Sequence, residues 1–377
     1  MRRCEYMRPC CRIKKVTEIA FVVNGGYESA MGYRARSFAA HLADSYNISI
    51  AYRSSNKFAS IVAFTKFLFG RRHRVTYVFD MAFSGVLAAV LHKMISRTPL
   101  IVDTGDSISA LARSMGRSRI GVWLTQCLEN ISVACADCIV VRGSFHRELF
   151  RKRNIQTALI RDGVDAAQFA PRNAAELRRQ KGLSDVVTIG IVGSSIWNER
   201  LQMCYGWELI ETTRLLRDKP IKGIIVGEGS GIPRLKALCE KYGIEDKVLF
   251  LGFINYVDLP LYLSMIDICL STQTNDIVGR VRTTGKLPLY LASGRYILAS
   301  DVGEAALVLD DDMRVPYAGV KDASYPSKLA ERINRLLESR YSFDPLEKNI
   351  TRAREEFDYS VLSKRLGTVI ESITHSI

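Results

Sequence analysis

The chain has 377 residues, about twice the length of an average domain, so two core-forming domains are expected. Hydrophobic residues make up 47% and charged residues 24%, a balance that excludes a largely disordered chain. Residues 1–175 contain 26 Lys and Arg against 12 Asp and Glu, whereas residues 176–377 contain 27 of each, so the first half carries the whole net charge of +14 and is expected to meet an anionic partner.

Short β-branched runs alternate with helical stretches along the first half, a pattern typical of a parallel sheet covered by helices. The expected strands are Glu18–Val23, Ile48–Tyr52, Thr76–Phe79, Leu100–Val102, Cys138–Val141 and Thr157–Ile160. The expected helices include Gly32–Leu42, Ser84–Met94 and Trp123–Cys135.

The second half repeats this pattern after a polar stretch at 165–184, where we place the domain boundary. Its expected strands are Val187–Val192, Gly223–Val226, Val248–Leu251, Ile268–Leu270 and Tyr296–Ala299. The sequence thus predicts an α/β protein with doubly wound domains at 1–172 and 184–354, and a ligand in the cleft at the carboxyl ends of the strands. Residues 355–377 are expected to form an amphipathic helix whose apolar side carries Phe357, Leu362, Leu366 and Ile370.

No run reaches the roughly 18 apolar residues that a membrane span requires. Basic residues stand near the start, but no apolar segment follows them, so export is not expected. The nine cysteines include one C-x-x-C pair, Cys135 and Cys138, for which simple packing is favoured over a zinc or redox site because no second pair or nearby histidine accompanies it. Reduced cysteines in a cytoplasmic protein fit best.

Three glycine-containing loops follow expected strands. Gly25 and Gly26 follow the first strand, Gly193 follows the first strand of the second domain, and Gly227 with Glu228 follows the next strand. Such loops let a backbone approach a phosphate or sugar closely, and the helix after the loop favours negative charge. For the loop with Gly25 and Gly26, a plain tight turn is the alternative.

A fourth loop, residues 279–287, combines three cations, two hydroxyls and two glycines before an apolar helical stretch. The ammonium of Lys286 can supply a point charge. The hydroxyls of Thr283 and Thr284 and the amide of Gly285 can donate hydrogen bonds, a combination that suits a diphosphate. The alternative is a solvated basic turn.

Five short motifs follow one another along most of the chain. They are Ile160-Arg161-Asp162-Gly163-Val164-Asp165 with Phe169 and Pro171, Gly227-Glu228-Gly229, Lys247-Val248 with Phe250-Leu251-Gly252-Phe253, Tyr262 to Leu270, and Lys286-Leu287 with Tyr290-Leu291-Ala292, Gly294 and Ala299-Ser300-Asp301. In this order and spacing they resemble the GT-B retaining glycosyltransferases of family 4.

The resemblance implies two Rossmann-like domains, a nucleotide-diphosphate sugar as donor, an acceptor held mainly by the first domain, and a terminal helix that returns to it. It also implies retention of anomeric configuration without a required metal or other cofactor. The family often has glutamate at the positions of Val281 and Leu289, and a lysine beside the arginine represented here by Arg200; these are missing, as is a first-domain histidine.

Acidic and basic candidates for the reaction follow from these positions. Asp103 and Asp106 stand where the fourth strand ends and could orient or deprotonate an acceptor hydroxyl, with helix capping as the alternative for Asp106. Arg200 and Lys286 would stabilise the charge that develops on the leaving diphosphate.

Two functions are alternatives to sugar transfer onto a glycan or lipid-linked acceptor. A catalytically silent relative that binds a nucleotide sugar or glycan as an assembly partner is favoured by the missing carboxylates. Nucleic-acid binding by the basic half lacks a recognisable motif.

Residues 57–74 combine aromatics with Arg71, Arg72 and Arg74 and are expected to anchor the protein on an anionic membrane surface. The alternative is that Phe64, Phe67 and Leu68 pack into the core.

Overall fold

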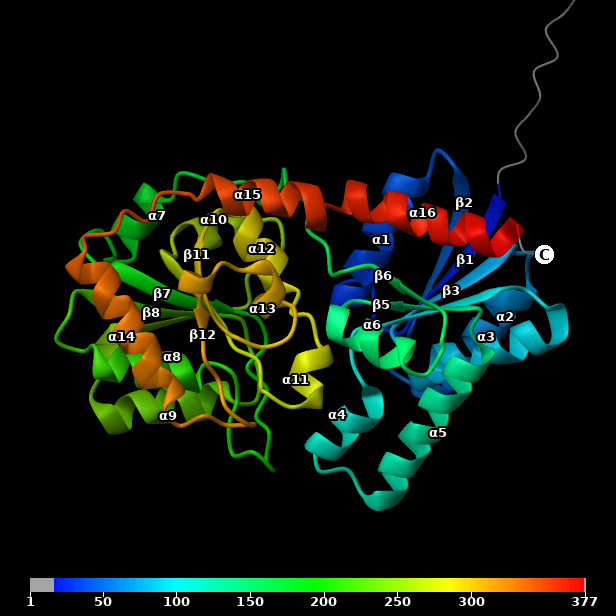
Figure 1. The fold of residues 1–377 in the computed structure, drawn as a ribbon, viewed down its shortest axis with the longest axis horizontal. Helices are drawn as coiled ribbons and strands as arrows, with labels where there is room; N and C mark the ends of the chain where they lie inside the picture. Colours follow the sequence, from blue (N-terminus) through cyan, green and yellow to red (C-terminus); the bar gives the residue numbers. More distant parts are fainter. Residues whose placement is uncertain (1–16, 376–377) are drawn as a thin grey trace, which may run out of the picture.

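The computed structural model describes residues 17–375, which form two parallel β-sheets, each with helices on both faces (Figure 1). The first sheet has the strand order β2-β1-β3-β4-β5-β6. Its strands are β1 Thr17–Val23, β2 Tyr46–Tyr52, β3 Val75–Phe79, β4 Leu100–Thr104, β5 Cys138–Val141 and β6 Thr157–Leu159. The helices of this half are α1 Ala30–Leu42, α2 Lys57–Phe69, α3 Phe83–Ser96, α4 Ile108–Ser114, α5 Arg119–Cys135 and α6 Ser144–Arg151.

The second sheet has the order β12-β11-β10-β7-β8-β9. Its strands are β7 Val187–Val192, β8 Ile221–Val226, β9 Val248–Gly252, β10 Ile268–Ser271, β11 Tyr296–Ser300 and β12 Arg314–Val315. Its helices are α7 Ala175–Gln180, α8 Trp207–Leu215, α9 Ile232–Tyr242, α10 Leu259–Ser264, α11 Ile277–Val281, α12 Lys286–Ala292, α13 Ala305–Val308, α14 Tyr325–Glu338 and α15 Glu347–Arg352. The two doubly wound α/β domains are thus confirmed, and the expected strands agree to within two residues at each end, whereas β12 was not expected.

Alternation along the strands divides the first sheet between two cores. In β1, Phe21 and Val23 point to the face that α1 covers, and Ala20 and Val22 point to the face of α2 and α3. Because side chains alternate along a strand, each buried strand of a parallel sheet must be apolar on both faces.

The chain passes between the domains twice. Residues 164–183 leave the first sheet and pack on the core of the second domain through Phe169 and Leu183. The return path is a π-helical turn at Ala353–Phe357, after which α16, Tyr359–His375, lies along α1 of the first domain (Figure 1). The expected terminal helix is therefore shorter at its start, and its last two positions, 376 and 377, lie outside the described residues.

The strand orders place a switch point in each sheet, where the chain changes direction across it. In the first sheet β1 and β3 lie side by side, and in the second β7 and β10 do. Doubly wound sheets bind ligands at the carboxyl ends of strands beside such a point. Among residues 17–375, no helix is long and apolar enough to cross a membrane.

Candidate functional site

A cavity of about 890 Å³ lies between the two sheets. Its walls include Asp80 directly after β3, Gly193 directly after β7 and Thr272 directly after β10. The carboxyl ends of both sheets thus contribute to one cleft at the two switch points, as expected for ligand sites of this fold.

Cationic side chains outnumber acidic ones on the walls of this cleft. The cations are Arg53, Lys57, Arg117, Arg282 and Lys286, and the acids are Asp80 and Asp106. A cleft lined mainly by one sign of charge concentrates ligands of the opposite sign, so this one favours an anion.

Lys286 begins α12 and borders the cleft. Burial lowers the pKa of its ammonium to about 8, and the carboxylate of Glu208 partly offsets this effect. Glu208 is fully buried at the start of α8; Oε2 accepts a hydrogen bond from the amide of Gly206 at 2.9 Å, and Oε1 has no hydrogen-bond partner of ordinary length among residues 17–375. Burial raises the pKa of Glu208. Functional sites often contain a cation whose charged form is destabilised by burial. A bound anion then stabilises that charge in place of water.

The acidic residues of the cleft come from the first domain. Asp80 has φ +69°, a backbone conformation that residues other than glycine adopt rarely and that clusters at functional sites. Burial raises the pKa of its carboxyl group. Oδ1 of Asp106 accepts a hydrogen bond from Nε of Arg282 at 2.7 Å, and this ion pair joins the two domains at the cleft.

Sequence analysis did not identify Asp80 or Glu208. The signal for Asp80 is its place as the first polar residue after a strand beside the switch point, and that for Glu208 is a carboxylate in the first turn of α8, next to the apolar residues Leu209 and Ile210.

Asp103 lies in β4 and is fully buried. Nε of Arg142 and Nε of Arg34 donate to its two oxygens at 2.8 and 2.9 Å, and the hydroxyl of Tyr77 donates at 2.9 Å. Burial by itself raises the pKa of Asp103, but the two guanidinium groups lower it below the usual value. The expectation that Asp103 meets an acceptor is therefore corrected: it forms ion pairs with two arginines inside the first domain, which Asp162 also approaches to within 3.9 Å.

Arg200 is not among the cleft-lining residues of the described chain. Its side chain is exposed, and Nη1 donates to the carbonyl oxygen of Arg113 at 2.6 Å across the domain gap. The structure thus corrects the placement of Arg200 beside the diphosphate: of the arginines that do line the cleft, Arg282 lies nearest along the chain to Lys286.

Gly25 and Gly26 also stand outside the described walls of the cleft. The carbonyl of Gly25 accepts a hydrogen bond from the amide of Arg53 at 3.1 Å, so this loop supports a residue that does line the cleft. Direct contact of the two glycines with a ligand is not supported.

Gly193 lines the cleft, and Gly227 lies behind it. A Cβ atom on Gly227 would be 2.2 Å from the carbonyl oxygen of Gly193, so only glycine allows the two loops to pack this closely. Glu228 is exposed, and its carbonyl accepts the amide of Ser195 at 2.9 Å. The expected donor contacts of Gly227 and Glu228 are corrected to a supporting role for the 193–195 backbone.

The 279–287 loop is divided between the cleft and the domain contact. Thr284 lines the cleft, whereas the hydroxyl of Thr283 donates to Asp162 of the first domain at 3.0 Å. Gly285 is the residue immediately before α12. Only part of the expected diphosphate loop therefore faces the cavity.

The two positions where the family often has glutamate are filled by core residues. Val281 is fully buried, and Leu289 is 9% exposed and belongs to the main core of the second domain. Neither position offers a hydrogen-bonding group to the cleft.

The sequence of the second domain is similar to that of a known protein family. Residues 186–339 match the model of the family Glycosyl transferases group 1. No curated protein sequence matches the chain.

Solved structures show the same fold over nearly the whole chain. Anabaena HepE, in complex with UDP and glucose, is 15% identical with a TM-score of 0.73, and the match covers 94% of this chain and 100% of HepE. Sucrose-phosphate synthase from Thermosynechococcus elongatus is 16% identical with a TM-score of 0.75, covering 96% of this chain and 100% of that one. WaaG, described as a glycosyltransferase involved in lipopolysaccharide biosynthesis, is 14% identical with a TM-score of 0.66, covering 94% and 99%.

Proposed function

We propose that this chain, whose second domain matches the glycosyl transferases group 1 on a GT-B fold, transfers a sugar from a nucleotide-diphosphate donor to a glycan or lipid-linked acceptor. The observation that carries the proposal is the cation-rich cleft at the facing switch points. The matched family supplies the reaction class, and the cleft supplies a place with the charge that a diphosphate needs. HepE is similar in fold and has UDP bound, which supports a uridine nucleotide as the first donor to test.

Lys286 and Arg282 are proposed to bind the donor diphosphate. In the reaction the bond between the anomeric carbon and the diphosphate oxygen breaks, and negative charge develops on that oxygen. Preorganised cations in a water-poor site stabilise this charge without reorganising, and losing one such contact commonly costs about 10²-fold in rate. The ammonium of Lys286 is suited to this role because a diphosphate offers it the anionic partner that Glu208 supplies only in part.

Asp80 and Asp106 are proposed to orient the acceptor hydroxyl. The acceptor oxygen forms the new bond to the anomeric carbon, and its proton passes to a carboxylate or to the departing diphosphate. The raised pKa of Asp80 brings its basicity closer to neutral pH, which favours proton acceptance. Asp106 must share its carboxylate with Arg282, so it is better placed to align the two domains around the acceptor.

Retention of configuration and independence from divalent metal are part of this proposal. Two cations of the chain supply the charge that a metal would otherwise supply to the diphosphate, so transfer is expected to persist in EDTA. Proton NMR of the first-formed product decides the configuration, since inversion would show the opposite anomer.

The test begins with thermal-shift measurements against UDP-, GDP- and ADP-linked sugars, because a ligand that binds the native state raises the unfolding temperature. A donor that binds is then assayed for transfer and for hydrolysis. Binding followed by turnover supports the enzyme. Binding without turnover supports the second candidate, a silent nucleotide-sugar or glycan-binding relative, which the apolar residues at Val281 and Leu289 favour.

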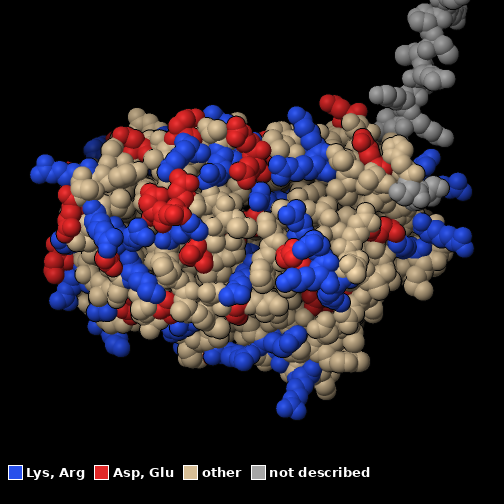
Figure 2. Space-filling view, in the orientation of Figure 1, with Lys and Arg blue, Asp and Glu red and all other residues tan. Residues whose placement is uncertain are grey.

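The surface that we propose to contact a membrane differs from the one expected at residues 57–74. Helix α2 forms as expected, but Phe64 and Leu68 are buried in the core, so the stretch is not a complete anchor. Exposed apolar side chains remain on α2, where Phe58 is 75% exposed, and also stand at the start of α5, where Ile120 is 71% and Trp123 is 63% exposed. Figure 2 shows Lys and Arg side chains gathered over α4 and the turn into α5.

We therefore propose that this end of the first domain contacts an anionic membrane surface near the mouth of the cleft. Co-sedimentation with phosphatidylglycerol vesicles is expected, and it should weaken in high salt and in Ile120→Ser with Trp123→Ser. Equal pelleting of the double variant, or none by the wild type at low salt, would rule out this surface.

A further inference from the structure

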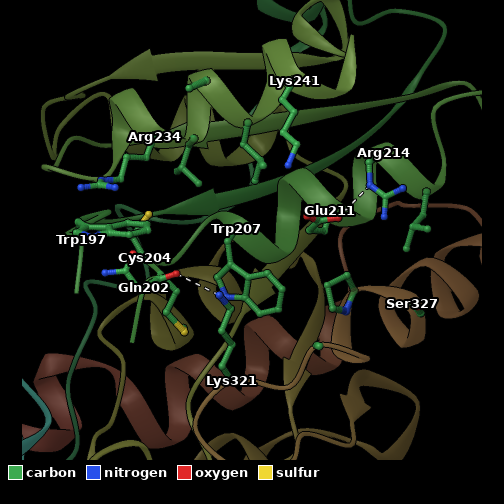
Figure 3. Close-up of a pocket in the computed structure, with 17 residues that line it drawn as sticks. Trp197, Gln202, Cys204, Trp207, Glu211, Arg214, Arg234, Lys241, Lys321 and Ser327 are labelled. Carbon is green, nitrogen blue, oxygen red and sulfur yellow. Dashed lines mark hydrogen bonds and ion pairs between the residues drawn. The ribbon is translucent and has the colours of Figure 1, made fainter. Parts of the chain in front are cut away.

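A second cavity of about 630 Å³ lies wholly within the second domain (Figure 3). It is bordered by the β7–α8 loop, residues 193–206, by α8 and α9, and by the start of α14. This volume is in the range of small-molecule sites. The proposed glycosyl transfer does not use it.

Two of the three tryptophans of the chain, Trp197 and Trp207, line this cavity. The indole N–H groups of both are buried and have no hydrogen-bond partner among residues 17–375. Leaving a buried donor unmatched costs about 1–3 kcal/mol. Acceptor atoms of a ligand would therefore satisfy donors that the protein itself leaves open, while its body packs against the rings.

The charges around the cavity are mainly positive. Arg214, Arg234, Lys241 and Lys321 line it against the single carboxylate of Glu211. Nε of Arg214 already binds that carboxylate at 3.0 Å, so Glu211 is neutralised within the wall.

Two of these cations can contact a ligand: Lys241, and Arg234, whose Nη2 forms only an exposed ion pair with Glu199 at 3.4 Å. Lys241 has no ion-pair or hydrogen-bond partner among the described residues, and its side chain reaches from α9 toward α8 in Figure 3. Arg234 lies over the ring of Trp197, with 4.2 Å between the guanidinium carbon and the ring centre. A cation stacked on an indole presents charge and a flat apolar surface side by side.

From these features we infer that the cavity binds an organic anion with a flat, largely apolar ring. The two indoles receive the ring, and Lys241 and Arg234 receive the carboxylate, sulfonate or phosphate group.

The same cavity adjoins the donor cleft through one thin wall. Met203 and Cys204 of the β7–α8 loop line both cavities. Nζ of Lys321 donates to the carbonyl oxygen of Gln202 at 3.1 Å, so a cation of the second cavity holds the backbone of this wall. Because Lys321 also lines the cavity, an anion bound by Lys241 and Arg234 competes with Gln202 for the Lys321 ammonium and shifts the loop, and a ligand in either cavity then changes affinity in the other by the same factor. This coupling rests on the proposed donor site; the anion site itself does not.

The test uses tryptophan emission in a Trp123→Phe background. Trp123 is on α5 and largely exposed, so its replacement leaves only the two tryptophans of the cavity as reporters. The probe is 1-anilinonaphthalene-8-sulfonate, and the matched control is N-phenyl-1-naphthylamine, which has the same rings without the sulfonate. Saturable quenching by the sulfonate, with at least tenfold weaker quenching by the neutral amine, is expected.

Lys241→Met is expected to weaken sulfonate binding about fivefold, the upper range for a solvent-accessible charge contact. Lys236→Met is the matched control, because Lys236 lies on the same helix outside the cavity and is expected to leave affinity unchanged. No saturable quenching, equal affinity for the two probes, or equal losses in both variants would each overturn the anion site.

The coupling is tested by repeating the titration with saturating UDP. At least a twofold change in sulfonate affinity is expected, with the reciprocal change in UDP affinity measured by calorimetry. Identical affinities with and without UDP would overturn the coupling. If calorimetry detects no UDP binding at all, the donor assignment fails, and the quenching data still decide the anion site.

Discussion

The charge on Lys286 is expected to make donor affinity depend on pH in the alkaline range. Its pKa of about 8 means that the ammonium is mostly charged at pH 7 and mostly neutral at pH 9. Because the charged form is the one that binds a diphosphate, affinity is nearly complete at pH 7 and is lost as the pH rises through about 8. This is the direction for a cation whose pKa burial has lowered.

The size of the effect follows from the contact that is lost. A hydrogen bond to a charged group contributes about 1.5–3 kcal/mol, so removing the charge should weaken UDP binding by roughly 10- to 100-fold between pH 7 and pH 10. Glu208 sets the midpoint, because its carboxylate raises the pKa of Lys286 against the effect of burial. Glu208→Gln should therefore move the fall in affinity to lower pH.

Isothermal titration calorimetry with UDP from pH 6.5 to pH 10 measures both effects. Lys286→Met is the control: it should bind weakly throughout and show only the titration of UDP itself. A wild-type affinity that stays level across this range would refute the role of Lys286, and an upward shift of the midpoint in Glu208→Gln would refute the pairing.

Four further substitutions follow from the described contacts. Arg282→Ala should reduce transfer by about 10²-fold, whereas Arg200→Ala should change it less than about threefold, because only the first borders the cleft; equal losses in rate assays would contradict this. Leu289→Glu should lower stability by about 3 kcal/mol by burying an unpaired carboxylate, and an unchanged melting temperature would show that the position is not enclosed. Asp103→Asn should cost about 3–5 kcal/mol in urea unfolding, since two buried guanidinium groups lose their counter-charge; a loss below 1 kcal/mol would mean that water replaces it.

The elements of both sheets could be predicted because buried parallel strands are continuous apolar runs. The side chains that reach the cleft could not be predicted in this way. Asp103 and Asp106 both stand near the end of β4, but strand alternation places Asp103 on the same face as Ile101, where α1 and α16 cover it. The sequence contains the alternation, yet it does not tell which face the last helix will cover.

The arginines were misassigned for a related reason. Arg200 belongs to a long loop without regular structure, and its direction depends on a backbone contact with Arg113 in the other domain. Arg282 follows a short helix that Asp276 caps, so local structure fixes its position along the chain. Its ion pair with Asp106, however, forms only because the first domain packs against this helix. Contacts between domains are the part of the site that motifs in one chain segment do not encode.

The return of α16 has a consequence for how the protein is made. Leu366 and Ile370 complete the core on the α1 face of the first sheet, so that core includes residues from both ends of the chain. Synthesis proceeds from the amino terminus, and domains generally fold as their residues emerge. Here the second domain, from β7 to α14, can fold before α16 has emerged, whereas the core of the first domain is completed only by α16. The face of α1 that α16 covers stays exposed to solvent during that interval.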